Sequence, residues 1–208
     1  GQMVAAVSAD LKVYFWNIAR QTGFPFTGFT NEIRSLSFAA GSSVLAVGDA
    51  DGNIFLLDYL LGQQAGRFRT PTRRPVSSLS FAPDGVTLIS SSLTDTNVLL
   101  WNISRNQSLA TPLTGHEFPV LDVAISSDNN TLAAVSGNLS SSTFGELWLW
   151  DRGTGEHREL LTGYDDLVTS VAISADGQYV AVGGVFNGEL QIWNTATGEE
   201  VLSYPTGQ

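Results

Sequence analysis

The sequence feature that most constrains the fold is an apolar segment that recurs five times. Each copy ends in a Trp or Leu followed by Asn or Asp, and the copies are Val13–Asn17, Ile54–Asp58, Val98–Asn102, Leu147–Asp151 and Leu190–Asn194. The Trp or Leu stands at residues 16, 57, 101, 150 and 193, so successive copies lie 41, 44, 49 and 43 residues apart. A nearly fixed period of this length indicates that one supersecondary unit is repeated along the chain.

A second motif keeps the same phase and predicts the other strands of each unit. Its copies are Ile33–Phe38, Val76–Phe81, Val120–Ile125 and Val168–Ile173, with apolar residues at the first, fourth and sixth places. Turn signals such as Asp84-Gly85 follow, and then a short apolar strand such as Val44–Val47. Each unit is therefore expected to contain an inner, a second, a Trp-bearing third and a weaker outer strand, with no helix longer than a turn. This order and the period predict an all-β fold, a β-propeller of four-stranded antiparallel blades.

The same motifs resemble the WD-repeat family of β-propellers. The Gly-His pair of that family is present once in full, as Gly115-His116, and its Trp-Asp pair once, as Trp150-Asp151. The resemblance covers the whole chain and implies approximate blades at residues 1–28, 29–70, 71–114, 115–162 and 163–208. It implies structural roles for Trp16, Trp101, Trp150, Trp193, His116, Asp95 and Asp151.

The resemblance also implies a buried hydrogen-bond relay of Asp, His, Ser or Thr, and Trp, but no repeat contains all its members. The third repeat has Ser91, Asp95 and Trp101, with Pro71 where the His should be. The fourth repeat has His116, Ser136 and Trp150, with a longer loop in place of the Asp turn. We therefore expect apolar packing to carry more of the stability than in a regular array. His116 is expected in the buried family position, His157 at the surface, and Trp148 pointing opposite to Trp150.

The strand count predicts an incomplete ring. The first unit begins with Met3–Val7, which matches the second strand of a blade, so the inner strand of that blade is missing. WD-repeat propellers usually have seven blades, which at about 43 residues each require roughly 300 residues. We therefore expect about five blades of a larger, seven-bladed propeller, completed by further propeller sequence or by another chain.

Composition argues against several classes of function. The chain has 10 Lys and Arg against 20 Asp and Glu, a formal net charge of −10, which disfavours binding to nucleic acid or to an anionic membrane. With no Cys and only two His, thiolate nucleophiles, metal centres and cofactor sites are not expected. No apolar run approaches the roughly 18 residues of a membrane span, and the N-terminus has no signal-peptide pattern. We therefore expect a cytoplasmic protein without membrane insertion.

The longest loop predicts one surface for a partner. Connections from outer to inner strands, and from second to third strands, are expected to share one face of a propeller, where binding residues gather. The Ser-rich segment 137–145 is the longest of these, and its Leu139 and Phe144 are candidate anchors; the alternative is a loop without a role. Phe118, Asp165, Asp166 and Phe186 are candidates on the same face.

A basic cluster is the second candidate surface. Arg67, Arg69, Arg73 and Arg74 are four of the ten Lys and Arg residues. Arg73 and Arg74 are candidates to contact an acidic partner or a phosphate, because guanidinium groups bind such oxygens in pairs. The alternative interpretation is a solvated outer strand and loop.

Motifs that carry catalysis are missing from the sequence. It contains no Gly-x-Ser-x-Gly elbow, no phosphate-binding loop with Lys and no paired His ligands, so an enzyme is not expected. The resemblance implies a non-catalytic scaffold for protein–protein interaction in a multiprotein complex, binding through the loop face. Two alternatives stay open: a regulatory or sensor propeller of a larger signalling NTPase or kinase, and a ligand-binding or enzymatic propeller that uses its central channel.

Overall fold

Strands supply the regular structure throughout the part of the chain that the structure describes. The computed structural model describes residues 2–108, 112–138, 140, 145–164, 167–184 and 188–205, with only the backbone of residues 162–164. Within these residues, nineteen strands run antiparallel to their neighbours in five sheets. Five candidate partner-binding residues lie outside the described residues: Leu139, Phe144, Asp165, Asp166 and Phe186.

The five sheets follow the order of the sequence. The first contains three strands, β1 (Met3–Ser8), β2 (Lys12–Asn17) and β3 (Thr22–Phe26). The second contains β4 (Ile33–Phe38), β5 (Val44–Asp49), β6 (Asn53–Asp58) and β7 (Gln63–Arg69). The third contains β8 (Val76–Phe81), β9 (Thr87–Ser92), β10 (Leu99–Asn102) and the short β11 (Gln107–Ser108). The fourth contains β12 (Val120–Ile125), β13 (Thr131–Gly137), β14 (Gly145–Asp151) and β15 (His157–Tyr164), and the fifth β16 (Val168–Ile173), β17 (Tyr179–Gly184), β18 (Glu189–Asn194) and β19 (Glu200–Pro205).

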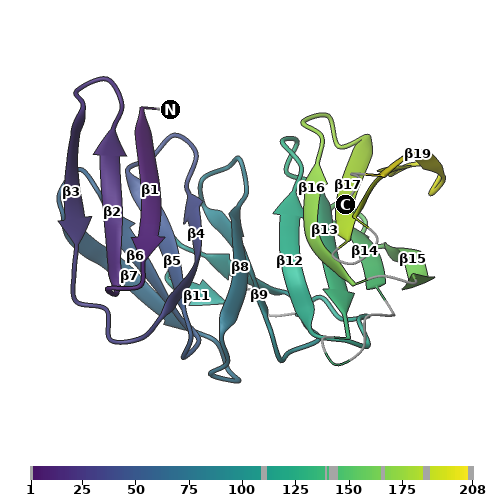
Figure 1. Cartoon of the computed structure of the whole chain (residues 1–208), viewed down its shortest axis with the longest axis horizontal. Coiled ribbons are helices and arrows are strands. Elements are labelled where there is room, and N and C mark those ends of the chain that lie inside the picture. Colours follow the sequence, from purple (N-terminus) through teal and green to yellow (C-terminus); the bar gives the residue numbers. More distant parts are fainter. Residues whose placement is uncertain are drawn as a thin grey trace.

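The sheets are arranged as blades of an open ring. The inner strands β4, β8, β12 and β16 lie next to one another in that order, and β1 lies beside β4. Figure 1 shows the first sheet at one end of the arc and the fifth at the other. The predicted all-β fold of antiparallel blades, with the inner strand missing from the first blade and the ring incomplete, is confirmed.

Small polar side chains connect the inner strands, which explains why the second motif places Ser between its apolar residues. Ser35 Oγ donates to the carbonyl oxygen of Val76 at 3.1 Å, and Ser77 Oγ donates to that of Val120 at 2.9 Å. Asp122 on β12 accepts from Ser78 Oγ at 2.6 Å on one side and from the Val171 N–H at 2.9 Å on the other. These bonds satisfy polar groups where the blades converge.

The apolar core lies between neighbouring blades. In the second, third and fourth blades, the residue at the Trp position of the third strand packs against the preceding blade: Leu57 lies in a cluster with Phe15 of the first blade. Trp101 lies against Phe68 of the second blade, with 5.1 Å between ring centroids. Trp150 belongs to a cluster with Ile89 of the third blade. The repeated Trp therefore holds successive blades together.

The Asn or Asp after each Trp closes the turn that leads to the outer strand. In all five blades its Oδ1 accepts backbone N–H groups of the following turn, and the acceptors are Asn17, Asp58, Asn102, Asp151 and Asn194. Asn and Asp offer the same carbonyl-type acceptor. The change from Trp-Asp to Trp-Asn in three repeats therefore leaves this turn intact.

Candidate partner-binding surfaces

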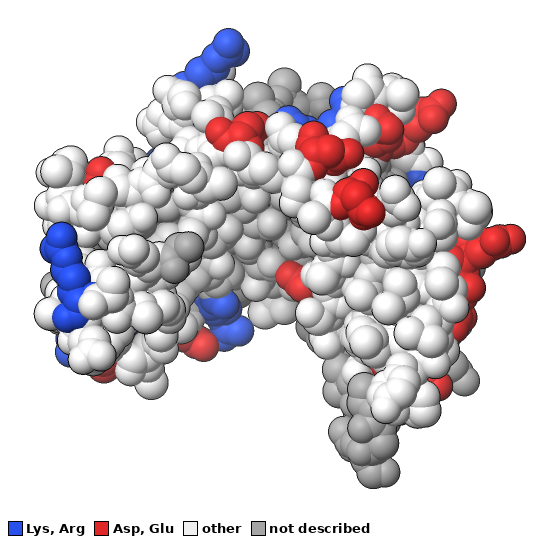
Figure 2. Space-filling model, turned by 90° about the horizontal axis from the view of Figure 1, so that it is seen from above, with Lys and Arg blue, Asp and Glu red and all other residues white. Residues whose placement is uncertain are grey.

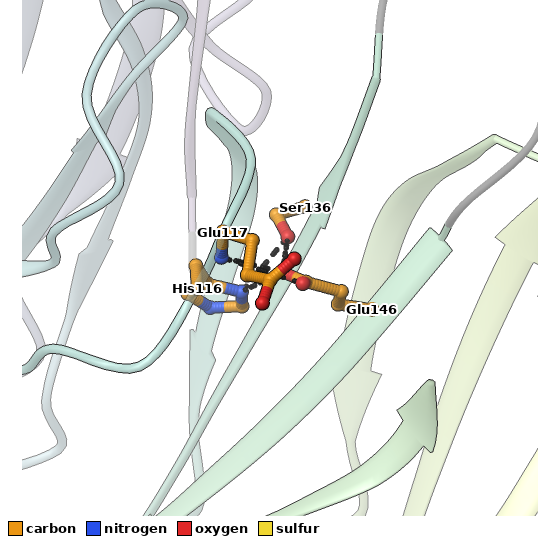
Figure 3. A network of polar contacts seen from close by, with 4 residues as sticks. All are labelled: His116, Glu117, Ser136 and Glu146. Atoms are coloured by element: carbon orange, nitrogen blue, oxygen red, sulfur yellow. Dashed lines mark hydrogen bonds and ion pairs between the residues drawn. The ribbon is translucent and has the colours of Figure 1, made fainter. Parts of the chain in front are cut away.

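The only complete Ser, His and carboxylate network among the described residues lies in the fourth blade. His116 Nδ1 lies 2.9 Å from Ser136 Oγ and 3.1 Å from Glu146 Oε2, and Ser136 donates a short hydrogen bond to the same carboxylate. The Glu117 N–H also donates to Glu146, at 3.2 Å. Figure 3 shows the carboxylate at the centre of these contacts. Ser136, His116 and Glu146 are all buried, and their mutual hydrogen bonds hold the blade together.

The carboxylate of this network comes from a residue that sequence reasoning missed. The sequence predicts no acidic member in the fourth repeat because a long loop replaces the Asp turn, yet Glu146 takes that place from the start of β14. Burial raises the pKa of Glu146, but the hydrogen bonds from His116, Ser136 and the Glu117 N–H outweigh it and hold the pKa below its usual value. The pairing of Ser136 with Glu146 across the two strands is the signal that identifies it.

The Trp148 ring leaves no room for a side chain at Gly115, the Gly of the Gly-His pair. Gly115 has a φ of +145°, and a Cβ there would lie 2.9 Å from a ring carbon of Trp148. Trp148 also stacks on Trp150, with 6.2 Å between centroids, and on His157 at 5.7 Å. The expectation that Trp148 points opposite to Trp150 is wrong, because residues two apart in a strand lie on the same face.

The third blade uses a different serine from the one expected. Trp101 Nε1 donates to Ser90 Oγ at 2.9 Å, whereas Ser91 Oγ lies 2.8 Å from Ser77 Oγ of the inner strand. The alternation of β9 places Ser90 on the Trp101 side and Ser91 on the opposite side. Asp95 accepts from the Asn97 side-chain amide at 3.2 Å, so it stabilises its own turn.

Three of the eight candidate partner-binding residues lie within the described residues. Arg73 and Arg74 are both exposed, in the connection between β7 and β8, and Phe118 is half-buried before β12. The structure brings Arg73 and Arg74 next to the turn between β5 and β6: a Cβ at Gly52 would lie 2.9 Å from the carbonyl oxygen of Arg74.

The two ends of the arc expose apolar sheet faces. On the first sheet, Trp16 is 55% exposed and Val4, its cross-strand partner, 48%. On the fifth sheet, Leu202 is 49% exposed and Tyr204 61%. Contiguous exposed apolar surface of this kind marks sites of interaction with other polypeptides.

The surface of the molecule also carries an acidic region and two hollows. On the face seen in Figure 2, acidic side chains gather over the half of the molecule that carries the C-terminal blades. A hollow of about 430 Å³ lies where the inner strands begin; its lining includes Glu32 and Arg34, which form an ion pair at 2.8 Å. A second hollow, of about 780 Å³, lies at the edge of the fourth blade and is lined by Trp150, His157 and Arg158.

The described part of the chain shows neither a metal-binding cluster nor a membrane-spanning helix. Its His, Asp and Glu residues form no group of three or more that could hold a metal ion. None of its segments is a helix with the length and apolar character needed to cross a membrane.

The similarities to known proteins agree with the blade structure. The sequence model described as "WD domain, G-beta repeat" matches residues 21–58, 62–102, 106–142 and 155–194. Each match begins near an outer strand and continues into the next blade, as residues 21–58 do from β3 to β6. A sequence repeat therefore joins two blades.

Curated relatives match nearly the whole chain. It is 29% identical over 204 residues to "Periodic tryptophan protein 2" of Arabidopsis thaliana, covering 98% of the chain and 22% of the relative. It is 25% identical to "Nuclear distribution protein nudF" of Aspergillus niger, with 86% and 39% covered, and 27% identical to "Transducin beta-like protein 3" of Rattus norvegicus, with 85% and 22% covered. The chain thus spans about a fifth of the Arabidopsis relative. Because the family model matches most of the chain and the blades have the corresponding structure, the protein belongs to the WD-repeat family.

Proposed function

We propose that this chain forms five blades of a larger, closed WD-repeat propeller that acts as a non-catalytic scaffold for protein–protein interaction. The observation that carries the proposal is the exposure of Trp16, at 55%. At the same place in the next three repeats, Leu57 is fully buried and Trp101 and Trp150 are 4% exposed, because each packs against the preceding blade. Trp16 therefore occupies the position that a preceding blade covers in these three repeats, and it has the same kind of large apolar side chain.

The opposite end of the arc supports the same proposal. Leu190 occupies in the fifth blade the position that Val13 occupies in the first, three residues before the Trp. Val13 is completely buried by the second blade, whereas Leu190 is 38% exposed. Burial of one large apolar side chain contributes about 1.5–3 kcal/mol, against a total stability of about 5–15 kcal/mol for a domain. Covering both ends therefore has a large effect on the stability of the arc.

A scaffold role is supported by where the loops lie. The connections that carry Arg73, Arg74 and Phe118 emerge from blades that are tied to one another through the inner strands. Loops that a rigid array of strands holds in place are where binding residues gather, and these loops carry charged and aromatic side chains. That the partner is another protein, and that the protein is cytoplasmic, both stay predictions.

The association state of the isolated 208-residue chain tests the proposal. We expect native mass spectrometry and size exclusion to find the chain associated rather than as a stable 22.2 kDa monomer. Trp16→Ser should reduce this association. The matched control is Leu61→Ser, because Leu61 is 69% exposed but lies on a turn outside the end faces. A monomer with a sharp, cooperative melting transition would contradict the proposal.

A further inference from the structure

Four arginines on the second blade form a basic surface without acidic partners. This arginine strip consists of Arg67 and Arg69 on β7 and Arg73 and Arg74 in the loop that follows. All four are exposed, and none forms an ion pair with a described carboxylate, in a chain whose net charge is −10. Two basic residues elsewhere do pair with carboxylates: Lys12 lies 2.7 Å from Asp10 and Arg34 lies 2.8 Å from Glu32.

The first arginine of the strip is held in place by its own blade. The Arg67 guanidinium donates to Asn53 Oδ1 at 2.7 Å and lies over the Phe55 ring, 5.0 Å from its centroid. Asn53 in turn donates to the buried Asp49 at 2.6 Å. A guanidinium fixed by stacking and one hydrogen bond keeps its other N–H groups for a ligand and loses little freedom on binding. Arg69 pairs with Asn53 across the two strands, so it lies on the same face as Arg67.

The last two arginines are held by a strained loop. The Thr70 N–H donates to the Gly52 carbonyl oxygen at 2.8 Å, and the Arg73 N–H donates to that of Thr70 at 3.2 Å. Arg73 has a φ of +53°, in the left-handed region that Gly and Asn occupy at lower cost than Arg. This conformation costs an Arg more than it would cost Gly or Asn, and the hydrogen bonds of the loop hold Arg73 in it.

The ligand class follows from the chemistry of the strip. Guanidinium groups bind carboxylates through two parallel hydrogen bonds. A nucleic acid would bring many phosphates against a chain of net charge −10, whereas a short acidic segment engages the strip alone. We infer that the arginine strip binds an Asp- and Glu-rich segment of a partner protein, an inference that rests on the proposed scaffold function.

The test is binding of a fluorescein-labelled peptide of alternating Glu and Ser, followed by fluorescence anisotropy at low salt. The corresponding Gln and Ser peptide is the uncharged probe. We expect Arg73→Gln/Arg74→Gln to weaken binding of the Glu peptide about tenfold. Arg20→Gln/Arg105→Gln is the matched control, because it makes the same change in net charge with exposed arginines of the β2–β3 and β10–β11 turns.

Folding of the variants is checked by their strand signal in circular dichroism. If Arg73→Gln/Arg74→Gln fails to fold, Arg73→Gly replaces it, because Gly relieves the positive φ while removing the charge. Equal weakening by the control variant, no binding of the Glu peptide, or equally tight binding of a single-stranded oligonucleotide would each overturn the inference. The proposed scaffold function is tested separately, by the association state of the chain, so failure of the inference and failure of the proposed function give different results.

Discussion

The Glu146 carboxylate lies 3.1 Å from His116 Nδ1, and both side chains are buried in the fourth blade. Ser136 and the Glu117 N–H complete the contacts of this carboxylate. Glu146, on β14, thus satisfies donors from two other segments of the chain: the connection before β12, and strand β13.

Replacing Glu146 with Ala should lower the free energy of unfolding by about 2–4 kcal/mol, because His116 and Ser136 would be left buried without their acceptor. The measurement is urea denaturation followed by circular dichroism. Glu156→Ala is the control, because Glu156 is exposed. Equal losses for the two variants would show that the network contributes nothing to stability.

Acid should destabilise the fold through the same carboxylate. The pKa of Glu146 is below its ordinary value of 4.5 in the folded chain, so its contribution to stability is complete above pH 4.5 and is lost as the pH falls through the folded value. Hydrogen bonds within their turns likewise lower the pKa of Asp128 and Asp176. We expect the melting temperature to fall below about pH 4.5 and to fall less steeply in Glu146→Gln. An identical pH dependence in that variant would contradict this assignment.

Ser90 and Ser91 should differ in their effect on stability. Ser90→Ala leaves the buried Trp101 indole N–H without an acceptor, at a cost of about 1–3 kcal/mol. Ser91→Ala removes one bond of Ser77, which still donates to the Val120 carbonyl oxygen, and should cost about 1 kcal/mol or less. Urea denaturation of both variants decides the order, and a larger loss for Ser91→Ala would contradict the register of β9.

Gly41 and Gly85 have nearly the same positive φ, so comparing them distinguishes the cost of the backbone conformation from the cost of a steric clash. Gly85 has a φ of +65° and Gly41 of +68°, but only at Gly85 would a Cβ meet a backbone atom, the Ala40 carbonyl oxygen at 2.5 Å. Gly41→Ala should cost about 1–2 kcal/mol, the penalty for a left-handed L-residue. Gly85→Ala should cost more, and similar melting temperatures for the two variants would show that the turn between β8 and β9 moves away from Ala40.

The architecture could be predicted from the sequence because it depends on local patterns. The Trp or Leu followed by Asn or Asp marks each third strand, and the turn bond of Asn or Asp explains why the motif tolerates both residues. The alternation of apolar and polar residues predicted the strands, and the regular spacing of the motifs predicted their grouping into blades.

The polar contacts could not be predicted in the same way because they depend on register. Glu146 lies beyond a long loop from Ser136, so only the strand pairing reveals that the two face each other. The choice of Ser90 over Ser91 depends on a single residue of register. The exposure of Trp16 likewise requires the three-dimensional arrangement, since its sequence motif is the same as that of the buried Trp101.

Hydroxyl-radical footprinting of the purified, soluble protein can show whether another blade covers the first sheet, because it measures the oxidation of individual tryptophans. We expect Trp16 to be protected to the same degree as Trp101 and Trp150, since another blade covers the first sheet in the assembled protein. Strong oxidation of Trp16 in a stable, soluble protein, with Trp101 and Trp150 protected, would show that the face needs no cover and would contradict the account.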